Sequence, residues 1–168
     1  MLIIYTSKHG YTLQLAERIF DFDKRRNKIF DISSSSDLWI ENEEKICILF
    51  PIYYGAPIGD VTKFLKRNSN LLESRKVILG VVGCNPDIFS DINYFLKLEN
   101  SDKELIREKL FGKLEKDYFD RFNVILIRGV VKKDELSEFE KRFNPNYNDV
   151  IIENEFEYEM LYEQLNTI

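Results

Sequence analysis

The sequence predicts an α/β fold in which a mostly parallel sheet carries helices on both faces. Apolar strand-like runs alternate along the chain with amphipathic helical segments, which is typical of this fold class. The apolar runs are also continuous, as expected for strands that are covered on both faces. At 168 residues the chain can bury a substantial core, and we expect one domain over residues 1–168.

The first part of the chain contains three expected strands and one helix. Residues 1–5 (MLIIY) form a short apolar run, and residues 12–22 place their apolar side chains near one stripe of a helix. Residues 28–32 (KIFDI) are expected to form a second strand, which a serine-rich loop follows. Residues 45–50 (KICILF) form a continuous strand-like run, in which we expect Cys47 to be a small buried hydrophobe.

The middle of the chain continues the alternation of helix and strand. Residues 59–72 have an amphipathic helical pattern, and residues 76–83 (KVILGVVG) form a continuous apolar strand. The pattern of residues 88–98 is ambiguous. A capping box, Ser101 with Glu104, predicts the start of a helix over residues 101–119.

The last part of the chain adds a fifth strand and a final helix. Residues 123–131 (NVILIRGVV) form the strand, and residues 155–165 have helical periodicity. Between them, residues 132–148 form a highly charged segment that we interpret as an insertion. No internal repeat or low-complexity linker indicates a second domain.

Composition excludes several functions. The net charge is −5, from 29 acidic and 24 basic residues, which argues against binding to nucleic acid. The two cysteines lie far apart and lack the spacing of zinc ligands. No apolar run approaches the ~20 residues of a membrane helix, so we expect a cytoplasmic protein without stable membrane insertion.

Three loops follow strands whose carboxyl ends meet at one edge of a parallel sheet, which is where such folds bind ligands. They are residues 6–12 (TSKHGYT), 51–57 (PIYYGAP) and 83–87 (GCNPD). The chain has only 7 glycines and 4 prolines, yet each loop contains a glycine and the last two contain prolines. This concentration predicts that the three loops form one site.

The first loop has the groups that bind phosphate. Backbone N–H groups at a helix N-terminus point outward, and the helix dipole favours an anion there. Thr6, Ser7 and Thr12 add hydroxyl donors, and Gly10 lets the main chain approach the anion closely. Alternatively, Thr12 caps the helix and Gly10 only makes the turn. The spacings of a Walker loop and of GxGxxG are absent.

The other two loops have groups that suit a planar ligand. Tyr53 and Tyr54 could place a ring face against it, or one of them could pack beneath the loop while the other is exposed. In the third loop, backbone donors and the Asn85 amide could meet the edge of a heteroaromatic ring.

Together these three loops resemble those of the flavodoxin-like FMN proteins. TSKHGYT is similar to the phosphate loop of that family, PIYYGAP to the segment that borders the isoalloxazine, and GCNPD to the loop at its other edge. The order hydroxyl-hydroxyl-basic-x-Gly-x-Thr, and the added segment after the fifth strand, most resemble the flavodoxin domain related to menaquinone-dependent protoporphyrinogen oxidase.

The resemblance implies a flavodoxin-like three-layer α/β/α sandwich with a five-stranded parallel sheet in the order 2-1-3-4-5. It also implies FMN as cofactor and a role in electron transfer or as an oxidoreductase, with a redox partner protein or a small organic substrate. Two alternatives stay open: a domain that has lost FMN and serves binding or regulation, and a quinone- or porphyrinogen-linked oxidase. The charged segment KKDELSEFEKRF departs from the more apolar stretch of that oxidase.

The resemblance implies three groups of cofactor-binding residues and assigns no catalytic residue or metal ligand. They are Thr6, Ser7, Lys8, His9, Gly10, Tyr11 and Thr12 around the phosphate, Pro51, Ile52, Tyr53, Tyr54 and Gly55 on one side of the ring system, and Gly83, Cys84, Asn85 and Pro86 on the other. His9 could be a charge partner of the phosphate or a proton donor near the flavin. Alternatively, it faces solvent and only its backbone matters.

Overall fold

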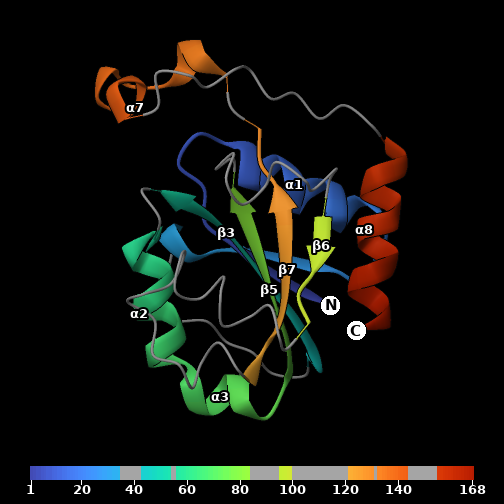
Figure 1. Cartoon of the computed structure of the whole chain (residues 1–168). Coiled ribbons are helices and arrows are strands. Elements are labelled where there is room, and N and C mark those ends of the chain that lie inside the picture. Colours follow the sequence, from blue (N-terminus) through green and yellow to red (C-terminus); the bar gives the residue numbers. More distant parts are fainter. Residues whose placement is uncertain (35–42, 54–55, 84–94, 100–120, 131, 144–154) are drawn as a thin grey trace.

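The computed structural model of the chain describes residues 1–34, 43–53, 56–83, 95–99, 121–130, 132–143 and 155–168 (Figure 1). Its centre is a twisted sheet with helices on both faces. Cys84, Asn85, Pro86, Tyr54 and Gly55 lie outside the described residues, as does the helix predicted over residues 101–119.

The five predicted parallel strands and their order are confirmed. They run β2-β1-β3-β5-β7 across the sheet, and each adjacent pair among these five is parallel. Their bounds are β1 Leu2–Tyr5, β2 Lys28–Asp31, β3 Lys45–Tyr53, β5 Lys76–Gly83 and β7 Asn123–Arg128. Because β1 lies between β2 and β3, the strand order reverses beside β1, and the loop after β1 lies at this switch point.

The sheet is larger than the five predicted strands, because two short antiparallel strands extend it. β4 (Ala56–Pro57) pairs with the end of β3, and β6 (Phe95–Lys97) pairs with β7 at one edge of the sheet. These strands have two and three residues, and Leu96 and Lys97 are exposed at the edge. Such short strands lack the continuous apolar pattern by which the others were predicted.

β3 extends three residues beyond its predicted end, through Pro51. A proline is unusual in a central strand because it has no N–H to donate. The Leu49 carbonyl accepts a bond from the Thr6 N–H, so the backbone of residue 49, and therefore of residue 51, faces β1. Since β1 ends at Tyr5, the missing donor of Pro51 faces a side where the strand has already ended.

The helices predicted over residues 12–22 and 155–165 are present with ends that differ by at most two residues, whereas the short helices over residues 32–34, 133–135 and 138–143 were not predicted. The bounds of the helices are α1 Tyr11–Asp21, η1 Ile32–Ser34, α2 Gly59–Arg67, α3 Ser69–Glu73, η2 Lys133–Glu135, α7 Glu138–Phe143 and α8 Glu155–Thr167. The helix predicted over residues 59–72 is divided at Asn68, whose side-chain amide donates to the Phe64 carbonyl over 3.0 Å. An asparagine that bonds the preceding turn in this way competes with helix continuation.

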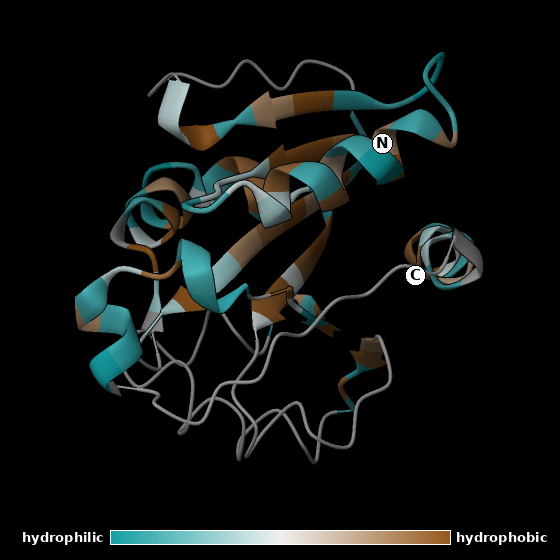
Figure 2. Cartoon of the chain, turned by 90° about the horizontal axis from the view of Figure 1, so that it is seen from above, coloured by the Kyte–Doolittle hydropathy of each residue, from teal (hydrophilic) through white to brown (hydrophobic). Residues whose placement is uncertain are grey.

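Apolar residues on the two sides of the sheet form two core clusters. On one side, α1 and α8 pack onto the sheet through residues such as Leu15, Ile19 and Leu161. On the other side, α2 and α3 contribute Phe64 and Leu72, among others. Figure 2 shows the hydrophobic residues concentrated in the central strands between these helices. In the described part of the chain, no helix is both long enough and apolar enough to cross a membrane.

Gly80, in the middle of β5, leaves no room for a side chain. A Cβ atom there would lie 2.4 Å from Leu49 Cδ2 and 3.2 Å from Ile127 Cδ1, and both of these side chains are fully buried. We therefore expect Gly80→Ala to lower the free energy of unfolding, measured in urea, by about 1–3 kcal/mol. Overpacking is relieved if Leu49 is shortened, so the losses from Gly80→Ala and Leu49→Ala should be less than additive. Additive losses would contradict this account.

Candidate functional site

The loop between β1 and α1 begins the helix in an unusual way. Gly10 is the N-cap residue, in the left-handed conformation (φ 85°, ψ −16°), and makes no side-chain cap. No acidic residue lies in the first turn of α1. The alternative in which Thr12 caps the helix is therefore wrong, because Thr12 lies inside the first turn. The positive end of the α1 dipole has neither a capping side chain at Gly10 nor a carboxylate in that turn.

Buried polar side chains are concentrated around this loop. Among the described residues, four polar or charged residues are buried: Thr6, Thr12, Asn27 and Glu140. Asn27 has a structural role, because its amide donates to the Ile19 carbonyl over 3.1 Å. The other three lie in the loop or against it. Because burying polar groups is costly, this concentration makes the loop the candidate site.

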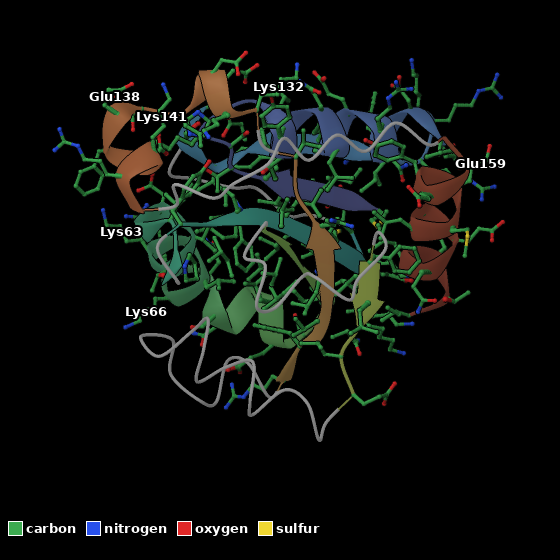
Figure 3. The ribbon with its side chains drawn as sticks, turned by 45° about the horizontal axis from the view of Figure 1, so that its top comes forward. Lys63, Lys66, Lys132, Glu138, Lys141 and Glu159 are labelled. Atoms are coloured by element: carbon green, nitrogen blue, oxygen red, sulfur yellow. The ribbon has the colours of Figure 1, made fainter. Side chains whose placement is uncertain are left out.

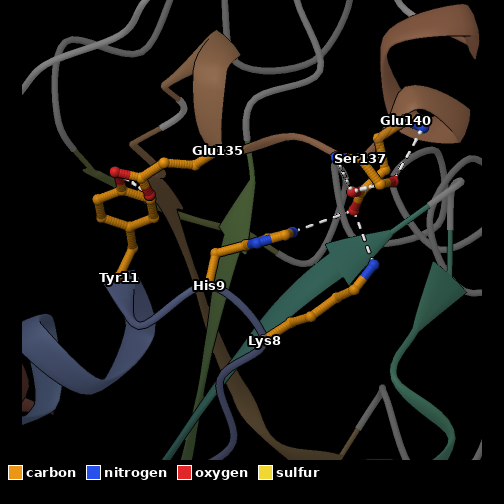
Figure 4. A network of polar contacts seen from close by, with 6 residues as sticks. All are labelled: Lys8, His9, Tyr11, Glu135, Ser137 and Glu140. Carbon is orange, nitrogen blue, oxygen red and sulfur yellow. Dashed lines mark hydrogen bonds and ion pairs between the residues drawn. The ribbon is translucent and has the colours of Figure 1, made fainter.

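The charged segment after β7 lies against the loop, and we call its residues 132–143 the strap. In Figure 1 the strap crosses the top of the view through η2 to α7, which lies at the upper left, beyond the end of β3. Glu140 of α7 accepts hydrogen bonds at Oε1 from Lys8 Nζ (2.7 Å) and pairs there with His9 Nε2 (3.0 Å), as Figure 4 shows. Its side chain is only 7% exposed. His9 therefore does not simply face solvent.

A capping box fixes the position of the Glu140 carboxylate. Ser137 donates to Glu140 Oε2 through its backbone N–H (2.9 Å) and its hydroxyl (2.6 Å). In return, the Glu140 N–H donates to Ser137 Oγ over 3.3 Å. This reciprocal pair is the usual N-terminal signature of a helix, here that of α7. One oxygen of Glu140 thus caps α7, and the other meets the loop.

The strap makes a second contact with the loop at the start of α1. The Tyr11 hydroxyl donates to Glu135 Oε2 over 2.8 Å (Figure 4). Lys8, His9 and Tyr11, three of the seven predicted phosphate-loop residues, therefore bind carboxylates of the strap.

The second predicted loop meets the first through Tyr53. The ring of Tyr53, at the end of β3, lies 5.8 Å from the His9 ring between centroids, at an angle of 56°. Lys8 Nζ lies 5.0 Å from the centroid of the same ring, within the range of a cation–π interaction. Pro51 is buried in β3, and Ile52 is half-buried. Tyr53 thus packs against the Lys8 and His9 side chains of the first loop.

Of the third predicted loop, Gly83 lies in the described residues. It ends β5, is buried, and accepts a 2.7 Å bond from the Gly129 N–H just beyond β7. In the described part of the chain, no cluster of three or more His, Cys, Asp or Glu side chains could hold a metal ion. Cys47 is buried as expected, and burial raises the pKa of its thiol to about 12, so it is unreactive near neutral pH.

The charge of Glu140 follows from competing effects. Burial alone would favour its neutral form, but hydrogen bonds from Lys8, Ser137 and His9 outweigh burial and hold its pKa well below the ordinary value of 4.5. A pKa lowered by folding means that the carboxylate stabilises the fold above the unfolded-state pKa. This contribution is lost as the pH falls toward the folded-state pKa.

We therefore expect Glu140→Gln to destabilise the chain more near neutral pH than in acid. Urea unfolding of the wild type and the variant at about pH 7 and about pH 3 measures this difference. Glu138→Gln is the control, because Glu138 lies in the same helix with its side chain 84% exposed. If Glu140→Gln lowers the stability equally or more in acid, the Glu140 side chain is not the stabilising carboxylate that we assign.

The site residues predicted from the sequence do not include Glu135, Ser137 or Glu140. Ser137 and Glu140 have the S-x-x-E spacing of a capping box, so the start of α7 could have been predicted. The contact of Glu140 with Lys8 could not, because the two residues are 132 positions apart in the sequence.

The parallel sheet and the loop at its switch point define a doubly wound α/β protein. The chain belongs to the flavodoxin domain family, whose model matches residues 2–141. This matched region includes the loop and the strap through α7 as far as residue 141. No curated protein matches the chain significantly.

Solved structures with related folds include flavodoxins and a larger flavoprotein. A flavodoxin variant of Fusobacterium nucleatum bound to flavin mononucleotide is 26% identical, with 52% of each chain covered and a TM-score of 0.37. A flavodoxin from the domain Archaea is 13% identical, covering 98% of this chain and 97% of that one, with a TM-score of 0.48. A flavo-diiron protein variant of Thermotoga maritima is 10% identical, covering 99% of this chain and 35% of that one, with a TM-score of 0.52. The chain thus spans about half of the Fusobacterium flavodoxin and a third of the Thermotoga protein.

Proposed function

We propose that this chain binds FMN and acts in electron transfer or as an oxidoreductase. The observation that carries the proposal is the start of α1, where Gly10 lies in the left-handed conformation with no side-chain cap at the switch point of the sheet. Such a helix start suits a phosphate group. Membership of the flavodoxin domain family supports the proposal, as does the FMN bound to the Fusobacterium flavodoxin.

In this proposal, the loop after β1 holds the phosphate. Its backbone N–H groups and the hydroxyls of Thr6, Ser7 and Thr12 are the donors. Pro51, Ile52, Tyr53, Tyr54 and Gly55 border one side of the ring system, and Gly83, Cys84, Asn85 and Pro86 border the other. When bound, FMN would supply the redox chemistry, while the chain supplies binding, orientation and electrostatics.

The redox partner could be another protein or a small organic substrate, and each case makes a different use of the chain. The net charge of −5 favours a diffusing carrier that docks on basic partner proteins, because complementary charge speeds association. An enzyme would instead bind a small organic substrate, such as a quinone or porphyrinogen, with the strap as one wall. The comparisons do not support the narrower relation to protoporphyrinogen oxidase, so this substrate class stays an alternative.

A flavodoxin domain without FMN is the second candidate function, and one observation favours it. Both basic side chains of the loop, Lys8 and His9, contact the internal carboxylate of Glu140. In a domain that serves binding or regulation, this pairing would take the place of an ionic contact with a phosphate.

Titration of the purified chain with FMN, followed by absorbance, tests the proposal. We expect saturation at one FMN per chain and reversible reduction in a potentiometric titration. A colourless preparation that gains no flavin absorbance would exclude both redox functions and leave the second candidate. If FMN binds, turnover of a quinone or porphyrinogen by the isolated chain indicates an enzyme, and reversible reduction without turnover indicates a carrier.

A further inference from the structure

The strap places negative charge against a loop that is proposed to hold an anion. Glu140 contacts Lys8 and His9, and Glu135 contacts Tyr11. Like charges repel, so these carboxylates oppose a phosphate at the same loop rather than attracting it. The arrangement needs an explanation beyond the binding of FMN.

The carboxylate in the ion pair of Glu140 is buried and held by several hydrogen bonds, which distinguishes this pair from the exposed ion pairs on the surface. Four donor atoms, from Lys8, His9 and Ser137, lie within hydrogen-bond distance of its two oxygens, and its side chain is 7% exposed. An exposed pair of similar length, Lys141 with Glu138 (2.9 Å), lies on the same helix with the Glu138 side chain 84% exposed (Figure 3). Such surface pairs contribute little, whereas a buried carboxylate with every oxygen bonded keeps its position.

The Lys8 and His9 side chains are also held from a second direction. Tyr53 lies within 5.0 Å of Lys8 Nζ and 5.8 Å of the His9 ring, measured to its ring centroid. The π face of Tyr53 favours the Lys8 ammonium in its present position, and the Glu140 carboxylate holds both the Lys8 and the His9 side chain. A phosphate that recruits Lys8 or His9 must therefore compete with Glu140.

We propose that Glu140 is a specificity-determining residue: an internal anion that competes with the ligand phosphate for Lys8 and His9 and so weakens the preference for FMN over unphosphorylated riboflavin. This inference rests on the proposed function. It predicts that the phosphate is held mainly by neutral donors while Glu140 is present. It also predicts that removal of the carboxylate frees the Lys8 and His9 side chains for the phosphate.

Fluorescence titrations of FMN and of riboflavin with the wild type, Glu140→Gln and Glu138→Gln test the inference. We expect Glu140→Gln to bind FMN about tenfold more tightly, because one negative charge near the phosphate is removed. Riboflavin has no phosphate, so its affinity should change by less than about twofold. Glu138→Gln changes the net charge equally but lies away from the loop, and both affinities should stay at the wild-type values.

Two outcomes of these titrations would overturn the inference. Weaker FMN binding by Glu140→Gln would mean that Glu140 supports the loop. Equal gains for FMN and riboflavin would mean that the strap is only a steric cover. Glu140→Asp guards against misfolding of the glutamine variant, since it keeps the charge but withdraws the carboxylate from the loop. It should shift the FMN affinity in the same direction by a smaller factor.

If no variant binds either flavin, the proposed function fails, and a separate measurement decides the inference. His9 is the one histidine of the chain, so its ring signals in NMR spectra are assigned without ambiguity. Titration with inorganic phosphate should shift these signals at about tenfold lower concentration in Glu140→Gln than in the wild type. The same dependence on phosphate in both proteins, or no shift in either, would overturn the inference.

Discussion

Gly10→Val is expected to reduce the affinity for FMN about a hundredfold while the sheet stays folded. At Gly10 the backbone has φ 85°, a conformation that costs a residue with a side chain about 1–3 kcal/mol, and a β-branched one most. A Cβ atom at Gly10 meets no atom within 4 Å, so the effect comes from the backbone and not from a clash. The loop is expected to relax to another conformation, which moves the N–H groups of the first helical turn.

A matched variant, Gly10→Asn, shows whether the loss of FMN affinity comes from the backbone conformation or simply from replacing glycine. Gly10→Asn should keep the affinity for FMN within about fivefold of the wild-type value, because asparagine tolerates the left-handed conformation far better than valine.

Thr12→Ala should also weaken the binding of FMN strongly, since the Thr12 side chain is buried at the loop. His9→Ala should have a much smaller effect. FMN titration measures all four variants. A loss from His9→Ala equal to that from Thr12→Ala would show that the roles in the loop are assigned wrongly.

Phe50→Ala is expected to have the largest effect on stability, lowering the free energy of unfolding by about 3–5 kcal/mol. Phe50 lies in β3, is fully buried, and belongs to the core cluster that α2 and α3 cover. Truncation leaves a cavity in the middle of the sheet, and a marginally stable domain loses a large part of its stability. Urea unfolding followed by circular dichroism measures the change.

Leu96→Ala is the control for this prediction. Leu96 lies in the edge strand β6 and is 48% exposed, so its truncation removes little buried surface. We expect a change below about 1 kcal/mol for Leu96→Ala. If the two variants lose similar stability, the core does not lie where the structure places it.

The fold could be predicted wherever burial imposes a continuous pattern. β5 has the predicted bounds, Lys76–Gly83, because every residue after Lys76 is buried and the sequence there is apolar without interruption. β6 pairs at an edge with two of its three residues exposed, so no such pattern marks it. The division between α2 and α3 depends on one side chain, Asn68, which donates to the Phe64 carbonyl. The periodicity of apolar residues gives no information on this bond.

The candidate site could be predicted in part. The loop after β1 was located because Gly10 and its neighbouring hydroxyls follow a strand and precede a helix. The partners of Lys8 and His9 could not be predicted, because a long-range ion pair depends on where the tertiary fold places the strap. The short S-x-x-E signal at Ser137 marks a helix start but gives no information on what the second oxygen of Glu140 contacts.

Pro51 shows how one strand can decide where its neighbour ends. The parallel ladder between β1 and β3 has its last bond from the Thr6 N–H to the Leu49 carbonyl. The next bond in this ladder would need a donor at residue 51, and proline has none. The chain after Thr6 therefore forms no further ladder hydrogen bond with β3. The missing N–H of Pro51 thus ends the pairing of β1 with β3, and the backbone after Thr6 enters the turn that Gly10 completes.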